Sequence, residues 1–350
     1  MITLEEAQGL LLKETKVNDI EEVNIFNSLG RVLAEDILSP IDSPPFNKSP
    51  LDGYAVIAKS LEGVSKENPR ILKVIDKVFA GEVSCKKVGD GEAIRIMTGA
   101  KIPKGADCIV KQEDTEALNE NEVRIFVSHK AYDNFIYQGE DFKRGIKIIN
   151  KDKFLASSII TAIASLGISK VKVYKKPIVG IITTGDELQE PGEELKEGKI
   201  FNSNKAFLYT RLLELGAEPR IFDIAKDSIE GIVSVVEKAE KECQIIISTG
   251  GVSVGEKDLV LRAVEFIGYR RLFWKISMKP GSPMFSAVKN GVIYIGLSGT
   301  PVAAATTFEL TARRVIAKML NCKDIDIRKV EGILQDEFKK KSPKRRFLRV

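Results

Sequence analysis

Histidine and cysteine are scarce in this 350-residue sequence, and their scarcity excludes several kinds of site. The single histidine, His129, has no cysteine near it, which argues against a histidine-activated nucleophile and against a histidine-rich metal site. The four cysteines (Cys85, Cys108, Cys243 and Cys322) are far apart and form no Cys-x-x-Cys pair, so neither a zinc finger nor a disulfide framework is expected. The chemistry must therefore use carboxylates, lysines, hydroxyls and backbone amides.

Long hydrophobic runs and a strong charge imbalance are also lacking. No apolar run approaches the roughly eighteen residues that a membrane-spanning helix needs, and the chain begins directly with a helix signal, so we expect a cytoplasmic protein. The net charge of +5 comes from the last fifteen residues, where seven lysines and arginines face only Asp336 and Glu337. Because the rest of the chain is neutral, neither a nucleic acid nor a membrane is predicted as a partner.

A proline-rich stretch separates two patterns in the first half of the chain. Thr3 and Glu6 form a capping box that opens an amphipathic helix. Residues 40–53 hold four prolines and predict a crossing between domains. From there to about residue 141, glycine-rich turns separate short strands, as in a small β-barrel or sandwich; we expect these strands at residues 54–57, 71–78, 92–97, 108–111 and 123–127. Residues 154–167 return to helical periodicity.

Strands and helices alternate from residue 177 to residue 320. We expect strands at residues 179–184, 220–223 and 245–248, and helices at residues 203–215, 228–241, 259–266 and 301–320. This alternation predicts a doubly wound, mostly parallel sheet. Thr300 as N-cap and Pro301 in the first helical position mark the start of the last helix. The final segment ends at Val350 inside a strand-like pattern, so we expect an incomplete C-terminal β domain.

Carboxylates follow three of the expected strands. The segments 177–187 and 243–258 each run from a buried strand into Thr-Gly and then into acidic residues, and ligands bind where parallel strands end. Glu187, Asp227 and Asp258 would share this edge, although each also has a structural interpretation, as a charge at a helix N-terminus, a capping-box residue and a helix cap, respectively. Together, three carboxylates raise one another's pKa unless a cation offsets them, which suits Mg²⁺.

The segment that follows the strand at 245–248 has the glycine spacing of a P-loop. Gly250 and Gly255 are correctly separated, but Glu256 stands where a P-loop needs lysine. The segment is therefore no P-loop, yet its amides can point at a phosphate or another oxyanion.

Two other loops also have the composition of anion sites. Lys275 and Lys279 flank a loop that Pro280 and Pro283 make rigid, with Gly281 allowing close backbone approach. Residues 297–301 could hold an anion at a helix start. A solvated turn and a simple helix cap, respectively, explain these two segments equally well.

A series of short motifs is spread along most of residues 1–320. They are Leu-Asp-Gly-Tyr-Ala at 51–55, Arg-Ile-Met-Thr-Gly-Ala at 95–100, Gly-Ala-Asp at 105–107, Gly-Glu-Asp at 139–141, Thr-Gly-Asp-Glu-Leu at 184–188, Ser-Thr-Gly-Gly-Val-Ser-Val-Gly at 248–255 with Asp258, and Lys-Pro-Gly at 279–281. As an ordered set they resemble the molybdopterin molybdenumtransferases, a family related to the C-terminal domain of gephyrin that acts last in molybdenum cofactor synthesis.

The resemblance implies a multidomain α/β chain that forms a homodimer. Its parts would be a discontinuous N-terminal α/β domain (1–45 and 142–176), an inserted β domain (46–141), a doubly wound molybdopterin-binding domain (177–321) and the start of a C-terminal β domain (322–350). The active site would lie between the doubly wound domain of one subunit and the inserted β domain of the other. It would thus join the six catalytic candidates, Asp52, Thr98, Asp141, Glu187, Asp227 and Asp258.

The implied reaction inserts molybdate into adenylylated molybdopterin and yields molybdenum cofactor and AMP. Glu187, Asp227 and Asp258 would hold Mg²⁺, and the dithiolene sulfurs of the substrate would bind the molybdenum. Contact with the preceding adenylyltransferase is also expected. The implied substrate-binding residues are Thr184, Gly185, Ser248, Gly250, Gly251, Ser253, Gly255, Lys275, Lys279, Gly281, Ser298 and Gly299.

The sequence departs from the family pattern in two loops. The family usually has Lys-Pro-Gly-Lys-Pro, and here Ser282 replaces the second lysine; it usually has Pro-Gly-Asn-Pro, and here residues 298–301 read Ser-Gly-Thr-Pro. Two other functions are therefore kept open. One is a molybdopterin adenylyltransferase, whose fold resembles the doubly wound domain alone, and the other is a non-catalytic pterin-binding or scaffolding relative. Molybdate and tungstate cannot be separated from sequence.

Overall fold

The computed structural model describes residues 1–225, 228–252, 259–333, 335 and 342–348. The chain divides into two compact units, one formed by Ile37–Ile149 and the other by Met1–Asp36 with Asn150–Val350. Each unit is described here by itself. Among the helices of the described residues, none combines the length and the apolar character needed to cross a membrane.

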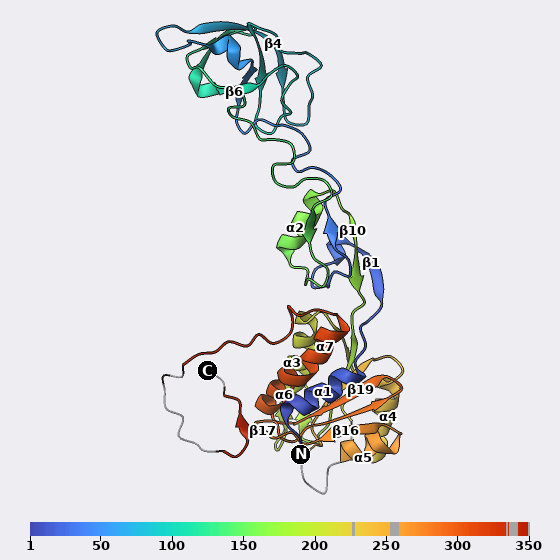
Figure 1. Cartoon of the computed structure of the whole chain (residues 1–350). Coiled ribbons are helices and arrows are strands. Elements are labelled where there is room, and N and C mark those ends of the chain that lie inside the picture. The colour runs from blue at the N-terminus through green and yellow to red at the C-terminus, as the bar shows by residue number, and fades with distance from the viewer. Residues whose placement is uncertain (226–227, 253–258, 334, 336–341, 349–350) are drawn as a thin grey trace. The chain divides into compact units, whose positions relative to one another are not determined.

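The unit Ile37–Ile149 contains a six-stranded sheet (Figure 1). Its strands, in spatial order, are β6 (Cys108–Lys111), β3 (Gly53–Val56), β5 (Glu92–Ile96), β4 (Arg70–Val78), β8 (Glu122–Ile125) and β7 (Thr115–Asn119). All neighbours are antiparallel except β4 and β5. Side chains alternate between the two faces of β3. Tyr54 and Val56 belong to one hydrophobic core and Ala55 belongs to another, so both faces of the strand are covered. The five predicted strands are confirmed; β7 was missed because its residues are largely exposed and polar.

The N-terminal part of the other unit is small. Strand β1 (Ile20–Asn24) pairs antiparallel with β10 (Lys170–Tyr174), and helix α2 (Ser157–Ser165) lies within the predicted helical segment. In the unit Ile37–Ile149, by contrast, two short strands, β2 (Ile37–Leu38) and β9 (Lys147–Ile149), pair with each other. Helix α1 (Leu4–Glu14) begins at the predicted capping box. The amide of Thr3 donates to Glu6 Oε2 at 2.7 Å, and the amide of Glu6 donates to Thr3 Oγ1 at 3.2 Å.

The C-terminal part holds the predicted doubly wound sheet. Its strands, in spatial order, are β14 (Glu218–Ile221), β11 (Ile178–Thr183), β15 (Ile245–Thr249), β19 (Val292–Leu297), β18 (Phe285–Lys289) and β16 (Arg270–Trp274). The first four are parallel, and β18 and β16 run antiparallel to their neighbours. The alternation of strands and helices therefore predicted a doubly wound, mostly parallel sheet correctly, together with three of its strands, β11, β14 and β15.

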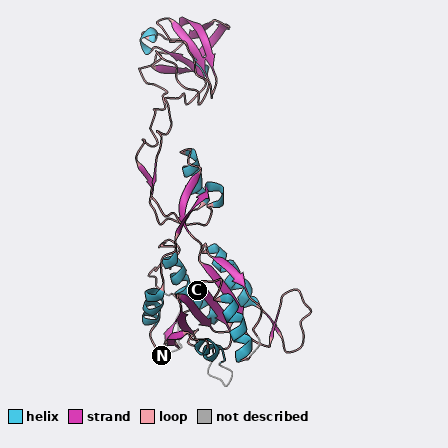
Figure 2. Cartoon of the chain, turned by 90° about the vertical axis from the view of Figure 1, so that its right-hand side faces the viewer, coloured by secondary structure: helices cyan, strands magenta, loops and turns pink. Residues whose placement is uncertain are grey.

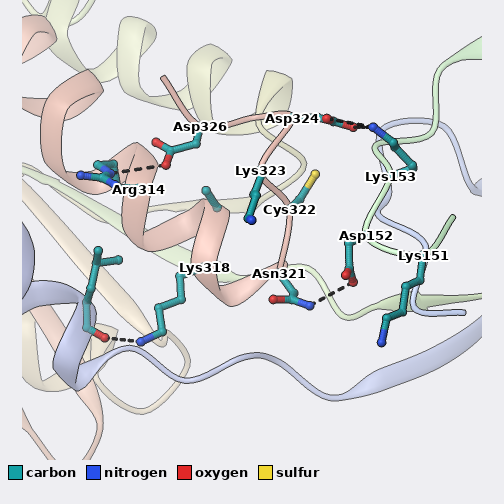
Figure 3. A pocket seen from close by; sticks show the side chains of 12 residues that line it. Lys151, Asp152, Lys153, Arg314, Lys318, Asn321, Cys322, Lys323, Asp324 and Asp326 are labelled. Atoms are coloured by element: carbon teal, nitrogen blue, oxygen red, sulfur yellow. Dashed lines mark hydrogen bonds and ion pairs between the residues drawn. The ribbon is translucent and has the colours of Figure 1, made fainter. Parts of the chain in front are cut away.

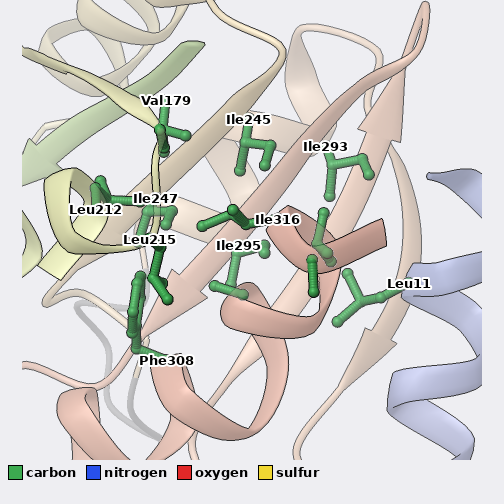
Figure 4. Close-up of a cluster of buried hydrophobic side chains, with 14 of the residues drawn as sticks. Leu11, Val179, Leu212, Leu215, Ile245, Ile247, Ile293, Ile295, Phe308 and Ile316 are labelled. Carbon is green, nitrogen blue, oxygen red and sulfur yellow. The ribbon is translucent and has the colours of Figure 1, made fainter. Parts of the chain in front are cut away.

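Helices cover both faces of this sheet (Figure 2). Helices α3 (Ser203–Glu214), α6 (Pro301–Thr307) and α7 (Arg313–Met319) pack with α1 on one face, against alternate strand residues such as Ile181, Ile247 and Ile295 (Figure 4). Helices α4 (Ile229–Ala239) and α5 (Leu259–Phe266) cover the other face, against Ile182 and Ile246. Burial of each such side chain stabilises the fold by about 1.5–3 kcal/mol.

The helix boundaries confirm some predicted caps and correct others. Pro301 begins α6 with Thr300 in the N-cap position, but the Thr300 side chain makes no cap hydrogen bond. The predicted helix 301–320 contains a π-helical turn at Phe308–Ala312. The capping box expected to start at Asp227 is wrong, because Ser228 is the N-cap of α4 and its hydroxyl accepts a hydrogen bond from the amide of Gly231 at 3.0 Å. Two short polar residues in succession both suit this position, so the pattern could not choose between them.

Three strands of the doubly wound sheet, β16, β18 and β19, were not predicted. Strands β18 and β19 form a hairpin closed by Asn290 and Gly291, whose φ angles are +50° and +84°. An Asn-Gly pair between two apolar runs is the strongest short hairpin signal, so this hairpin was readable in the sequence. The described part of the C-terminal segment adds strand β20 (Arg345–Arg346), which pairs in parallel with β17 (Met278–Lys279).

We predict that Gly296→Ala destabilises the doubly wound sheet. A Cβ atom at residue 296 would lie 2.2 Å from the Phe285 ring, which is fully buried and stacked on Tyr294 at 5.5 Å. The expected loss is about 1–3 kcal/mol, the usual cost of overpacking a core. Urea unfolding followed by circular dichroism measures it. Gly9→Ala is the control, because nothing lies within 4 Å of its Cβ position and alanine favours an exposed helix. If the urea midpoint of Gly296→Ala equals that of the wild type, the close contact between residue 296 and Phe285 is not present.

Candidate functional site

The carboxyl ends of the parallel strands meet at one edge of the doubly wound sheet. Thr183 pairs with Thr249, and Thr249 pairs with Leu297, so β11, β15 and β19 end at the same level. The loops that follow them contain Thr184 to Glu187, Gly250 to Val252 and Ser298 to Thr300. The predicted convergence of strand ends is therefore present in the fold.

The antiparallel strands bring the lysine loop to the same edge. Trp274, the last residue of β16, pairs with Phe285, the first residue of β18, and Phe285 pairs with Gly296 near the end of β19. Because the chain between Trp274 and Phe285 leaves and re-enters the sheet at this level, residues 275–284 lie at the carboxyl edge. Lys275, Lys279 and Gly281 thus join the strand-end loops.

Glycine allows these loops to touch. Gly250 has a φ of +95°, and a Cβ there would lie 2.3 Å from the carbonyl oxygen of Thr184. Gly251 has a φ of +60°, and its Cβ would lie 2.5 Å from the side chain of Val260. The Gly299 Cβ position is 3.5 Å from the Gly250 Cα, an ordinary van der Waals contact. A side chain at 250 would therefore separate two loops that are packed backbone to backbone, and a side chain at 251 would collide with Val260.

Several backbone donors at this edge are unused. The amides of Gly185, Gly251 and Gly299 donate to no group within the described residues, whereas the amide of Gly250 donates to the Leu297 carbonyl oxygen at 3.2 Å. Thr184 is held by its own amide, which donates to the Thr249 carbonyl oxygen at 3.0 Å. Free amides from three neighbouring loops can bind the oxygens of a phosphate or another oxyanion.

Glu187 is the described member of the predicted metal-binding set. Its exposed carboxylate lies over Gly185, whose φ is +141° and whose Cβ position is 2.6 Å from Glu187 Oε2. Among the described residues, this carboxylate has no hydrogen-bond or ion-pair partner, and no group of three acidic, cysteine or histidine side chains forms a metal cluster. The partners predicted for it, Asp227 and Asp258, lie outside the described residues. An exposed carboxylate with no partner among the described residues fits a hard cation such as Mg²⁺.

The lysine loop presents two cations with different surroundings. Lys275 has a φ of +64°, a conformation that costs free energy outside glycine, and its ammonium lies 4.1 Å above the Trp274 ring centroid. Lys279 is exposed and pairs with no acidic side chain in the described part of the chain. Gly281, with φ +91°, packs so closely that its Cβ would lie 2.3 Å from the Thr307 side chain. The loop is thus fixed against α6 while its lysines remain available.

Ser282, at the position where the family usually has lysine, has a cation beside it. Lys344 Nζ donates to Ser282 Oγ at 3.1 Å, and the Ser282 hydroxyl donates to the Ile276 carbonyl oxygen at 2.9 Å. The amide of Phe347 also donates to the Lys279 carbonyl oxygen at 2.9 Å. The C-terminal strand therefore places an ammonium next to the substituted loop position. Sequence reasoning missed Lys344 because it is 62 residues away from Ser282.

The other substrate-binding candidates divide into three groups. Ser248 is fully buried, and its hydroxyl has no partner in the part of the chain that the structure describes, so its side chain lies beneath the edge and not on it. Ser298 is half-buried, and its hydroxyl accepts the Thr300 amide at 3.4 Å. Ser253 and Gly255 lie outside the described residues.

Two buried asparagines at the start of α3 were also missed. Asn202 donates through Nδ2 to Thr183 Oγ1 at 2.9 Å, and Asn204 donates through Nδ2 to the Gly299 carbonyl oxygen at 2.7 Å. Both residues belong to an Asn-Ser-Asn sequence directly before and within the first turn of the helix. Nothing in that local sequence indicated which distant loops the side chains would reach.

The unit Ile37–Ile149 brings two of its three predicted catalytic residues together. Asp52 Oδ1 accepts hydrogen bonds from the hydroxyl and the amide of Thr98, each at 2.7 Å. These bonds, the hydroxyl first, hold the pKa of Asp52 below its ordinary range, and Arg95 contributes in the same direction. Asp141 is bound separately: its amide donates to the Ser43 carbonyl oxygen at 2.9 Å, and its carboxylate accepts the Ser43 hydroxyl at 3.4 Å.

The Gly-Ala-Asp motif at 105–107 has a structural role. Asp107 Oδ1 accepts a hydrogen bond from the amide of Ala58 at 2.6 Å, which fixes the turn that follows β3. Gly105 has a φ of +89°, and its Cβ would lie 2.3 Å from the Val88 carbonyl oxygen. This motif therefore supports the β sheet and contributes no reactive group.

A cavity of about 520 Å³ lies away from these residues, next to the C-terminal end of α7 (Figure 3). Ion pairs cross its walls: Lys153 is 3.2 Å from Asp324, and Arg314 is 3.4 Å from Asp326. Asn321 also donates to Asp152 at 3.0 Å. Much of its charge is thus neutralised locally, and the cavity serves as a polar junction between chain segments.

Comparison with known proteins gives consistent results along the chain. Residues 2–167 match the MoeA N-terminal region (domain I and II), and residues 180–318 match a probable molybdopterin binding domain. The chain is 38% identical to the molybdopterin molybdenumtransferases of Staphylococcus epidermidis and Bacillus subtilis, with all of this chain and 83% and 82% of those proteins covered. The crystal structure of the molybdopterin biosynthesis moeA protein from Pyrococcus horikoshii OT3 matches with a TM-score of 0.78 and 34% identity, over 97% of this chain and 84% of that one.

We predict that Thr98→Val raises the pKa of Asp52 toward the ordinary aspartate value of about 3.9, because the hydroxyl donor is lost. Because the pKa of Asp52 is lower in the folded state than in the unfolded state, its carboxylate stabilises the fold at every pH above the unfolded-state pKa. This contribution disappears as the pH falls through the folded-state pKa. The variant should therefore be less stable than the wild type near neutral pH and equal to it in acid. Carboxyl NMR titration and unfolding at several pH values measure both effects. Thr161→Val, whose hydroxyl donates to a helix carbonyl, should leave the pKa of Asp52 unchanged.

Proposed function

The chain belongs to the molybdopterin molybdenumtransferase family, and from this premise we propose that it inserts molybdate into adenylylated molybdopterin and releases AMP. The matched regions include the N-terminal and β segments as well as the doubly wound domain. This supports the transferase over a molybdopterin adenylyltransferase, whose fold corresponds to the doubly wound domain alone.

One observation carries the proposal: backbone amides, a carboxylate and two lysines that have no partner among the described residues share one sheet edge. Gly185, Gly251 and Gly299 offer amide donors, and Lys275 and Lys279 offer positive charge without a carboxylate partner in the described part of the chain. A substrate with a phosphoanhydride and a tetrahedral oxyanion carries the complementary negative charge.

Glu187, together with Asp227 and Asp258, would hold Mg²⁺ at this edge. When bound, the ion would offset the charge of the phosphoanhydride. The chain's own groups bind and orient the reactants: the glycine amides hold phosphate oxygens, and Lys275 and Lys279 hold molybdate or the terminal phosphate. An oxygen of molybdate or of water attacks the phosphoanhydride and AMP leaves. The two dithiolene sulfurs of the substrate bind the molybdenum in place of molybdate oxygens, which take up protons and leave as water. No protein thiol is needed, in keeping with the burial of Cys108, Cys243 and Cys322.

Asp52, Thr98 and Asp141 would complete the site from a second copy in a homodimer. The low pKa of Asp52 keeps its carboxylate ionised near neutral pH, so it is suited to orient the Thr98 hydroxyl or to face a cation. It is not suited to donate a proton. Contact with the preceding adenylyltransferase and a cytoplasmic location stay predictions from the sequence.

We predict that the purified chain, given adenylylated molybdopterin and Mg²⁺, releases AMP only when molybdate is added. Glu187→Gln should lower this rate by at least about tenfold, because the neutral amide binds a divalent cation less well. AMP quantification with and without molybdate measures it. Glu197→Gln is the matched control, since this exposed glutamate makes no interaction in the described part of the chain. Tight substrate binding without AMP release would instead support the scaffolding function.

A further inference from the structure

The first turn of α3 contacts two of the three strand-end loops. Asn202, which is 1% exposed, caps the helix through an acceptor bond from the Lys205 amide at 3.3 Å and donates to Thr183 at the end of β11. Asn204, which is 9% exposed, donates to the carbonyl oxygen of Gly299 after β19. The loop after β15 lies between them, because Gly250 contacts both Thr184 and Gly299. One helical turn therefore fixes the spacing of the three loops.

Asn204 has no role in capping its own helix. The cap position belongs to Asn202, so the amides of the first turn are not the partners of the Asn204 side chain. Its only hydrogen bond in the described structure reaches a carbonyl that is 95 residues away. A buried amide group aimed at a distant loop acts on that loop and not on the helix that carries it.

The hydrogen bond from Asn204 sets the direction of one peptide group. In a planar trans peptide, the carbonyl and the following N–H point in opposite directions. With the Gly299 carbonyl turned toward Asn204, the N–H of Thr300 points away from α3. Its partner is the Ser298 hydroxyl at 3.4 Å, a hydrogen bond longer than usual, which a bound anion can replace. Gly299 itself imposes little restriction on this peptide plane, because glycine permits both orientations. Pro301 holds Thr300 in an extended conformation (φ −69°, ψ 123°), so the choice between orientations rests on Gly299.

We propose that Asn204 is a positioning residue of the anion site: it holds the 299–300 peptide so that its N–H can bind an oxygen of a tetrahedral oxyanion. This inference rests on the proposed function of the sheet edge. The oxyanion can be the phosphate of the adenylyl group or molybdate, since both present tetrahedral oxygens to an N–H donor. A cavity of about 480 Å³ between α3 and α6 is also lined by Asn204 and Pro301.

The test compares Asn204→Asp with the wild type. Aspartate has nearly the same shape but cannot donate to the Gly299 carbonyl, so the peptide loses its fixed orientation. Because aspartate also adds a negative charge, the uncharged Asn204→Leu, which has a similar shape and no donor, should weaken binding as well; a loss in Asn204→Asp alone would reflect charge repulsion and contradict the inference. We expect the dissociation constant for AMP or for molybdate, titrated separately by calorimetry, to rise about tenfold, the loss expected for one hydrogen bond. The anion whose affinity falls identifies the one that the 299–300 peptide binds. In the AMP-release assay, the KM for molybdate should rise by a similar factor if molybdate is the affected anion, and the KM for adenylylated molybdopterin if AMP is. The melting temperature should change little.

Two further variants separate positioning from general stability. Ser203→Ala, on the same helical turn, removes an exposed hydroxyl that has no partner in the described residues and should leave both affinities unchanged. Gly299→Ala is sterically tolerated, since its Cβ would meet Gly250 Cα at 3.5 Å, and it narrows the conformations open to the peptide. In the Gly299→Ala protein, the added change Asn204→Ala should weaken anion binding less than it does in the wild type. This comparison tests the positioning role even if Asn204→Asp folds poorly.

Each outcome has a distinct meaning. If the wild type binds AMP or molybdate and Asn204→Asp binds both equally well, Asn204 does not position the site and the proposed function stands. If binding weakens only in step with a fall in melting temperature, and Gly299→Ala changes nothing, the role of Asn204 is structural and the inference is wrong. If the wild type binds neither anion and releases no AMP, the proposed function fails, and the inference fails with it.

Discussion

The backbone of Gly250 lies against the carbonyl oxygen of Thr184, closer than any side-chain-bearing residue would permit. This contact closes the gap between the loops after β11 and β15, and Gly299 packs on the other side of Gly250. The free amides, the Glu187 carboxylate and the lysine loop can share one edge because these three loops are this close together. Chemistry at the edge therefore depends on an arrangement that only glycine allows.

The strands of the sheet and helix α3 hold these three loops in place. Strands β11, β15 and β19 end in register over cores on both faces, so the loops start from a rigid base. Arg211 of α3 is bound to Glu309 in the π-helical turn, which Arg313 also binds. Burial raises the pKa of Glu309, but the bonds to Arg211 and Arg313 outweigh burial and hold this pKa below its ordinary value. Helix α3, which carries Asn202 and Asn204, is thereby fixed to the segment that follows Gly299.

Local patterns predicted what local physics determines, and they missed what depends on distant contacts. Alternating apolar runs predicted the parallel strands, and the spacing of Thr3 and Glu6 predicted the first helix. Its place directly after a buried strand of the expected parallel sheet predicted that Glu187 would lie at the carboxyl edge. The pairing of Asp52 with Thr98, the approach of Lys344 to Ser282 and the reach of Asn204 to Gly299 join residues 46, 62 and 95 positions apart. No periodicity reports such contacts, because they depend on how strands and helices pack in three dimensions.

The single tryptophan of the chain gives the lysine loop an optical property. Trp274 lies beneath the ammonium of Lys275, at a distance where the cation interacts with the indole ring. An anion that draws Lys275 toward itself removes a positive charge from the face of the only indole, and the emission of that ring depends on the field around it. If an anion bound at the sheet edge draws Lys275 away from this ring, its binding would change the intrinsic fluorescence of the unlabelled protein, and no other tryptophan in the sequence contributes to that signal.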